Sequence, residues 1–148
     1  MNAKNAVSLY AFFERMNSKA EHTLATAQFL INTQKHPNES VHCSYYAVFQ
    51  YMVYFLAMMK INPIPYDEQK ARANGQGSHN FVIEEIGNRM QASAKEERRF
   101  KEKIRNLKQA RVQADYEERS ITTDESLVYK QLADGLIAQL KQYFKDKI

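Results

Sequence analysis

Three polar residues near the end of a predicted helix carry the clearest chemical signal in this sequence. They are Arg111, Asp115 and Tyr116. The apolar residues of the same helix fall three or four positions apart, at Phe100, Ile104, Leu107 and Ala114. This spacing turns Arg111 toward the packed side of its helix. A guanidinium there needs a partner, because an unpaired buried charge is prohibitively costly.

Two interpretations of Arg111 remain open at this point. In the structural one, it pairs with Asp115 one helical turn later, or extends from the edge of the core to water. In the functional one, it faces a cleft and binds a phosphate, which its planar group fits well. Asp115 would then orient Arg111, and Tyr116 would donate a hydrogen bond or stack on a base. Otherwise the two form a helix-end ion pair and a half-buried tyrosine.

The histidines do not predict a metal site. They stand at His22, His36, His42 and His79, and no two form HExxH or another i, i+4 pair. His79 follows a glycine-containing segment and is the best placed of them to contact a ligand; otherwise it is a surface residue in a first helical turn. His42 precedes Cys43, but neighbouring helical positions point about 100° apart and make a poor catalytic dyad.

Other catalytic and cofactor motifs are missing. The sequence has no Walker A loop, no GxGxxG and no nucleophile elbow, so we predict no cofactor and no catalytic residue. Its single cysteine excludes an intrachain disulfide and a cysteine metal cluster. This cysteine usage, together with an N-terminus that lacks a continuous apolar segment, predicts a cytoplasmic protein.

Positive charge is concentrated in one segment. The formal net charge is +4, and residues 95 to 111 alone contain eight Lys or Arg against three Glu. Such a helix can lie along a phosphate backbone. It can equally be a solvated face with i, i+4 pairs such as Glu97 with Lys101.

The 148 residues include only four Gly and three Pro, which favours long helices in one domain, residues 1–148. We predict five helices in an up-and-down all-α bundle. The first has an apolar face at Leu9, Phe13, Met16, Ala20, Leu24, Ala27 and Ile31 and ends before Pro37. The second runs from an N-cap at Asn38 or Ser40 to about Lys60, and residues 61–77 form one long connection.

The remaining three helices follow this connection. Ser78 caps a short helix with Phe81, Val82, Ile86 and Met90, and a charged helix runs from about Ala94 to Glu118. Thr122 and Glu125 have capping-box spacing and open the last helix. The apolar face of that helix is predicted at Leu127, Leu132, Leu136, Leu140 and Phe144.

The second helix is rich in tyrosine, at Tyr45, Tyr46, Tyr51 and Tyr54. Its apolar run from Tyr45 to Met59 is shorter than the about 20 residues of a membrane span. At helical spacing these rings are core residues or a dimer face, although they could also provide stacking platforms.

Three strings together resemble the HEPN superfamily, in its small stand-alone prokaryotic branch. They are Ser44-Tyr45-Tyr46-Ala47-Val48-Phe49, Ser78-His79-Asn80-Phe81-Val82-Ile83 and Arg111-x-x-Ala114-Asp115-Tyr116. The resemblance covers roughly residues 10 to 145. It implies a four- to five-helix bundle that forms a homodimer, with the late arginine facing a cleft at the dimer interface. It also implies a minimal nucleotidyltransferase as partner, in a toxin–antitoxin or defence system.

The chain departs from this family at one decisive place. Ribonuclease members have a histidine about four to six residues after the arginine, to act as acid or base at the ribose 2′-hydroxyl. Here the residues after Arg111 are Val-Gln-Ala-Asp-Tyr-Glu-Glu-Arg-Ser. We therefore expect a non-catalytic module that binds RNA or a nucleotide through Arg111, Asp115, Tyr116, His79 and Tyr45. The alternatives are a divergent ribonuclease toxin using Arg111 with His79 or Tyr116, and a helical interaction protein without a nucleic-acid role.

Overall fold

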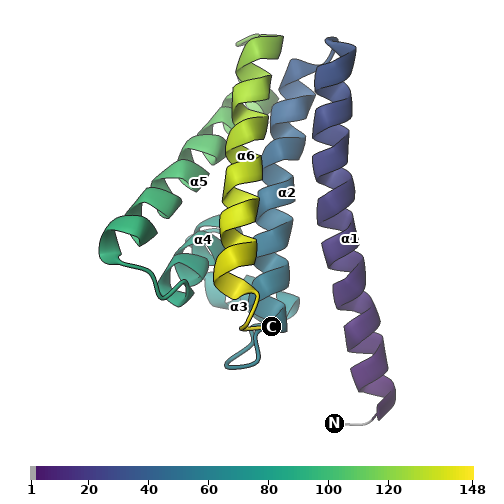
Figure 1. Cartoon of the computed structure of the whole chain (residues 1–148), viewed down its shortest axis with the longest axis vertical. Coiled ribbons are helices and arrows are strands. Elements are labelled where there is room, and N and C mark those ends of the chain that lie inside the picture. Colours follow the sequence, from purple (N-terminus) through teal and green to yellow (C-terminus); the bar gives the residue numbers. More distant parts are fainter. Residues whose placement is uncertain (1–2) are drawn as a thin grey trace.

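The computed structural model describes residues 3–148, except for the side chains of residues 3–10, 12 and 13. It is an all-α bundle, as predicted, with no strand in the described part of the chain (Figure 1). Its helices are α1 (Ala3–Thr33), α2 (Pro37–Met58), α3 (Tyr66–Ala73), α4 (Ser78–Arg89), α5 (Ala94–Tyr116) and α6 (Thr123–Phe144). None of the described helices is both long and apolar enough to cross a membrane.

Helix α2 is the centre of the bundle and packs against α1, α4, α5 and α6. Figure 1 shows α1, α2 and α6 side by side along the long axis, with α5 inclined to them and α4 between the lower part of α5 and α2. Apolar residues cover nearly all of α2, as expected for a helix surrounded by others. The largest fully buried side chains include Tyr45, Tyr51, Met52 and Leu56 of α2, Phe100, Ile104 and Leu107 of α5, and Phe144 of α6.

The predicted apolar faces are largely confirmed. In α1, Ala20, Ala27 and Ile31 are buried and Met16 and Leu24 are partly buried, whereas the side chains of Leu9 and Phe13 lie outside the described ones. The prediction for Leu127 of α6 is wrong, because this side chain is 38% exposed. In the first turns of α6 the inward positions are Ser126 and Lys130, and Lys130 bonds Asp134 at 2.8 Å.

Helix starts follow local capping chemistry. Thr122 and Glu125 form the predicted capping box at α6, and Ser93 with Glu96 forms a second one at α5 that we did not predict. The predicted N-cap Ser78 is wrong, since Gly77 holds that position and Ser78 is the first residue of α4.

The start of α2 also differs from the prediction. The helix begins at Pro37, whose fixed φ suits a first helical position, and not after Asn38 or Ser40. The amide of Asn38 instead donates to the carbonyl of Ala114 at 3.0 Å and accepts from the N–H of Ile121 at 3.0 Å. It therefore links the start of α2 to the end of α5 and to the segment before α6.

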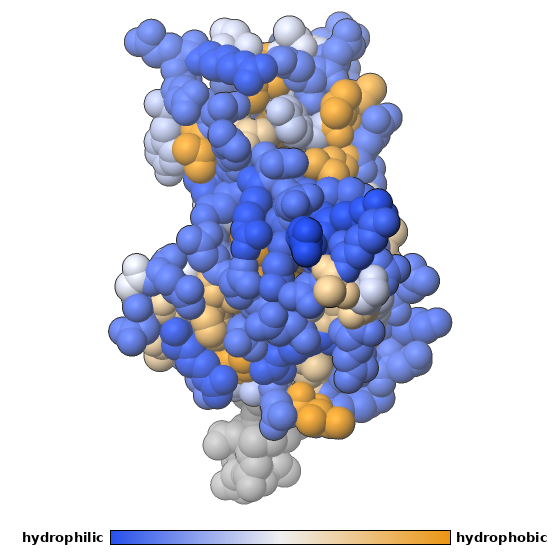
Figure 2. All heavy atoms as spheres, turned by 90° about the vertical axis from the view of Figure 1, so that its left-hand side faces the viewer, coloured by the Kyte–Doolittle hydropathy of each residue, from blue (hydrophilic) through white to orange (hydrophobic). Residues whose placement is uncertain are grey.

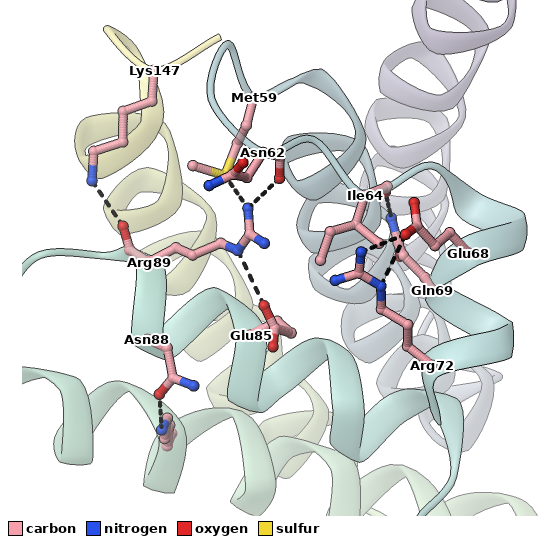
Figure 3. A network of polar contacts seen from close by, with 11 residues as sticks. Met59, Asn62, Ile64, Glu68, Gln69, Arg72, Glu85, Asn88, Arg89 and Lys147 are labelled. Carbon is pink, nitrogen blue, oxygen red and sulfur yellow. Dashed lines mark hydrogen bonds and ion pairs between the residues drawn. The ribbon is translucent and has the colours of Figure 1, made fainter. Parts of the chain in front are cut away.

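The prediction of one long connection at residues 61–77 is wrong, because this segment contains α3. Pro65 stands at the N-cap, and Asp67 and Glu68 complement the partial positive charge of the first turn. Gln69 is 2% exposed, and its Nε2 donates to the carbonyl of Val53 at 3.1 Å. The same Nε2 donates to the carbonyl of Ile64 at 2.7 Å (Figure 3). One buried amide thus links this helix of eight residues to α2, while α3 packs mainly against α4.

Candidate functional site

The five residues that the sequence analysis selected lie in one cluster. Tyr45 comes from α2, His79 from the first turn of α4, and Arg111, Asp115 and Tyr116 from the last turns of α5. The Cζ of Arg111 lies 5.2 Å from the ring centre of Tyr45 and 6.0 Å from that of Tyr116. The Oη of Tyr45 lies 2.5 Å from the Nδ1 of His79. Their role in binding stays a prediction.

Arg111 is the centre of the cluster and is only 7% exposed, which confirms that it turns toward the packed side of its helix. Its guanidinium also lies 5.5 Å from the ring centre of Tyr46, so three aromatic rings face the cation. The Nε of Arg111 is buried and has no hydrogen-bond partner among the described residues. Aromatic faces compensate part of the buried charge, and one donor remains unsatisfied.

Asp115 is paired more closely with another residue than with Arg111. Its Oδ2 lies 3.5 Å from the Nη1 of Arg111, beyond the usual range for an N–H···O hydrogen bond. The Nδ1 of His42 lies 3.0 Å from Oδ1 and 2.9 Å from Oδ2 of the same carboxylate. The intrahelical ion pair therefore exists but holds Arg111 loosely.

His42 is the residue of this cluster that sequence reasoning missed. Positions 42, 45, 46 and 49 share one face of α2, which places His42 beside Tyr46 with ring centres 4.6 Å apart. That spacing was a usable signal for one aromatic face. It could not show that Asp115, 73 residues later, meets this face.

His79 is half-buried among aromatic rings and is not a surface residue. It stacks on Phe49 with ring centres 4.1 Å apart. Burial, followed by the charges of Arg111 and Lys108, lowers the pKa of His79 to about 4. Burial also raises the pKa of Tyr45, against the opposing effect of Arg111. The hydroxyl of neutral Tyr45 can therefore donate a hydrogen bond to the Nδ1 of neutral His79, which fixes the tyrosine ring beneath the guanidinium.

A second cation stands one helical turn before Arg111. The Nζ of Lys108 donates to the Oδ1 of Asn80 at 2.8 Å, a neutral partner. Burial, then Arg111 and then Arg105, lower the pKa of Lys108. Arg105 is itself paired with Glu84. The lowered pKa values of Lys108 and His79 have a common cause in part, since both groups stand in the positive field of Arg111.

The rest of the basic helix is mainly a solvated face with ion pairs. Lys101 bonds Glu97, as predicted, at 2.7 Å and also bonds Glu84 at 2.8 Å. Figure 2 views the molecule from the side on which α5 lies, and this face is largely hydrophilic with small scattered apolar patches. Positive charge is therefore spread along α5. The side chain of Lys101 is nearly as buried as that of Arg111, with 12% and 9% exposed, but Lys101 bonds two carboxylates, so Arg111 differs from it by its incomplete pairing.

A cavity of about 530 Å³ lies beyond the C-terminal end of α2 and does not include Arg111. Its walls come from residues 59–62, the end of α4 and the chain's last residues, and include Arg89 and Lys147. Arg89 donates to Glu85 at 3.1 Å and to the carbonyl of Asn62 at 2.7 Å, while Lys147 donates to the carbonyl of Arg89 at 2.8 Å (Figure 3). These cations join chain segments and already have acceptors.

Metal and thiol chemistry have no support at the cluster. Within the described residues, no group of three or more His, Cys, Asp or Glu is arranged to hold a metal ion. Burial, then the charges of Asp115 and Glu39, raise the pKa of Cys43 and favour its neutral thiol.

The arrangement can bind an anion beside aromatic faces and can hold an imidazole against a carboxylate. Both abilities depend on α5 presenting Arg111 and Asp115 to the aromatic face of α2. Neither a scan against models of known protein families nor a search of curated proteins finds a match for this chain.

Proposed function

We propose that the protein is a non-catalytic, HEPN-like helical module that binds a phosphate group of RNA or of a nucleotide at Arg111. The observation that carries this proposal is the incomplete pairing of a buried guanidinium. Its Nε has no acceptor among the described residues, and its nearest carboxylate is 3.5 Å away and shared with His42. A bound phosphate would supply the missing negative charge.

Neighbouring groups fit a nucleotide better than a bare anion. Tyr116 is 77% exposed, so its ring offers a stacking surface for a base beside the guanidinium. Lys108 adds a positive charge that no carboxylate neutralises among the described residues. Following the HEPN resemblance, we propose that the module forms a cytoplasmic homodimer and pairs with a minimal nucleotidyltransferase, in a toxin–antitoxin or defence system.

Binding of a fluorescent single-stranded RNA at low salt, followed by anisotropy, tests the proposal. Arg111→Gln removes the buried cation and should weaken binding by about tenfold or more, because a hydrogen bond to a charged group contributes about 1.5–3 kcal/mol. Arg99→Gln, an exposed position on the same helix, is the matched control and should weaken binding by less than about threefold. AMP and ATP, added as competitors, compare nucleotides with RNA.

Two results would count against this function. If Arg111→Gln and Arg99→Gln weaken binding equally, the RNA binds to the overall positive charge of α5 and not specifically to Arg111. If the wild-type protein binds neither RNA nor nucleotides at low salt, a helical interaction module without a nucleic-acid role becomes the better explanation.

We infer a second candidate, a divergent metal-independent ribonuclease, from the position of His42. Its Nδ1 faces Asp115, which leaves Nε2 free, and its side chain is 46% exposed. The Nε2 would accept the proton of a ribose 2′-hydroxyl while that oxygen attacks the adjacent phosphorus. The 5′-oxygen would leave and take a proton from water, giving a 2′,3′-cyclic phosphate and a free 5′-hydroxyl. His79 is poorly suited to this role, because its Nδ1 is bonded to Tyr45.

Cleavage of single-stranded RNA in the presence of EDTA tests this candidate. Wild-type protein should form cyclic phosphate ends, whereas His42→Asn and Arg111→Gln should abolish them and His22→Gln should not. Toxicity on expression that Arg111→Ala removes would agree with the same activity. Intact RNA after prolonged incubation with the wild-type protein would refute it.

A further inference from the structure

One carboxylate, that of Asp115, contacts both an imidazole and a guanidinium in the Arg111 cluster. The oxygens of Asp115 lie 2.9 and 3.0 Å from the Nδ1 of His42, and Oδ2 lies 3.5 Å from the Nη1 of Arg111. The side chain of Asp115 is 18% exposed and that of His42 is 46% exposed. His42 can thus exchange protons with solvent, while the Asp115 carboxylate that it contacts stands beside the buried guanidinium of Arg111.

This geometry makes Asp115 a competitor of any anion at Arg111. An ionised carboxylate is negatively charged and can only accept hydrogen bonds, so it repels a phosphate that approaches the same guanidinium. A protonated His42 would neutralise that repulsion, because its positive charge stands in direct contact with both carboxylate oxygens. A neutral His42 still donates a hydrogen bond to Asp115 in the suitable tautomer, but it leaves the negative charge in place.

We propose that His42 is a positioning residue that acts through Asp115 and makes anion binding at Arg111 depend on a proton. An anion binds more tightly when His42 is protonated, and by reciprocity its binding draws a proton onto His42. The inference rests on the proposed anion site and adds its regulation. It requires no contact between His42 and the ligand.

Other charged groups surround His42 and define the controls. On α2, Glu39 stands one turn earlier and Tyr46 one turn later. Helix α5 contributes Asp115 and Arg111. Helix α4 contributes His79, whose pKa of about 4 keeps it neutral at higher pH. Helix α1 places Arg15, Lys19 and His22 around the neighbouring Cys43, and in α6 Lys130 is paired with Asp134. His22 and His36 are the other two exposed histidines of the described chain. His22→Gln is therefore the matched control for His42→Gln.

The experiment uses a ten-nucleotide 2′-O-methylated oligouridine, which cannot undergo 2′-hydroxyl cleavage and keeps a constant charge between pH 5.5 and 8. Calorimetric titrations of the full chain at both pH values, in buffers of different ionisation enthalpy, give affinity and proton uptake. Wild-type protein and His22→Gln should bind about fivefold or more tightly at pH 5.5 than at pH 8. They should also take up a fraction of a proton near neutral pH.

Two variants distinguish coupling between His42 protonation and anion binding from a general effect of charge. In His42→Gln the pH dependence should largely disappear, because the amide can still donate to Asp115 but does not titrate. In Asp115→Asn the affinity at pH 8 should rise toward the wild-type value at pH 5.5. Unchanged pH dependence in His42→Gln, or no gain at pH 8 in Asp115→Asn, overturns the inference. Binding that depends on Arg111 but not on pH overturns the inference alone, whereas no binding at any pH also overturns the proposed function.

Discussion

Arg89 is the last residue of α4 and Arg111 lies in the last turns of α5, and the surroundings of the two arginines are opposite in kind. Arg89 donates to the carboxylate of Glu85, the carbonyl of Asn62 and the sulfur of Met59, at 3.1, 2.7 and 3.3 Å (Figure 3). Arg111 faces three aromatic rings and a carboxylate at 3.5 Å, and its Nε has no partner among the described residues. Unsatisfied donors, and not the number of cations, distinguish a candidate binding site from a structural network.

The same comparison explains why the cavity beside Arg89 and Lys147 is the weaker candidate for a binding site. It lies where α2, α4 and α6 end, and helix ends expose carbonyls that attract cations. Lys147 donates to the carbonyls of Arg89 and Met90, at 2.8 and 3.3 Å. These cations complete the helix ends, so the cavity is a gap between capped segments. The Arg111 cluster, by contrast, keeps an unused hydrogen-bond donor in the Nε of Arg111.

Replacing Arg89 and Arg111 in turn by methionine should give the largest difference in stability between the two sites. Arg89→Met leaves Glu85 and the carbonyl of Asn62 without their donor, so unfolding should become easier by about 2 kcal/mol. Arg111→Met removes a poorly paired buried charge and keeps the apolar volume, so stability should change by less than about 1 kcal/mol or rise. Urea denaturation measures both. Equal losses in the two variants would mean that Arg111 is structural as well.

The stability of the protein against acid should reveal the environment of His79. Its pKa is lowered to about 4 in the folded chain, so the folded state binds fewer protons than the unfolded state below the ordinary histidine value. Stability from this group is therefore complete above about pH 6.5 and is lost as the pH falls toward 4. We expect a loss of about 1–2 kcal/mol after discounting for partial exposure. The variant His79→Gln should lack this part of the acid sensitivity, and a pH profile identical to that of the wild type would contradict the assignment.

Lys108 and Lys147 give the smallest test of the same contrast. Lys108→Gln should weaken RNA binding by about threefold and lower its salt dependence by roughly one phosphate contact, with little change in stability. Lys147→Gln should leave RNA affinity unchanged and lower stability by about 1 kcal/mol, because two carbonyls lose a charged donor. Salt titrations of RNA binding and urea denaturation measure the two effects. If Lys147→Gln weakened RNA binding and Lys108→Gln lowered only stability, the binding site would lie at the Lys147 end of the bundle and not at Arg111.

Local sequence rules predicted most of the fold. Helical periodicity located the long helices, and apolar stripes placed Arg111 on the packed side, where it is 7% exposed. They failed where a long-range contact decides the outcome. Helix α3 depends on Gln69 reaching the carbonyl of Val53, and the start of α2 uses Asn38 as a tertiary clamp and not as a cap. The inward side of α6 includes Lys130, which composition alone would assign to solvent.

The candidate site was predictable in its parts but not in its pairing. The residues Tyr45, His79 and Arg111 came from motifs on three separate helices, and the structure brings them together. The bond between His42 and Asp115 joins α2 to α5, so no spacing within one helix could predict it. It was also this contact that changed the interpretation of Arg111, by showing that its nearest carboxylate already has a partner.

The amide of Asn38 has a consequence for how much the α5–α6 corner can vary. It joins that corner to α2 one helical turn before His42, so the clamp and the imidazole share a single rigid segment. Residues 117, 118 and 120 can change in sequence without misaligning the two helices, provided that the amide contacts survive, whereas Arg119 also bonds Gln113 of α5 and Glu125 of α6. Damage to those contacts would instead shift α5 along α2 and separate imidazole from carboxylate, although neither of those two residues had been altered.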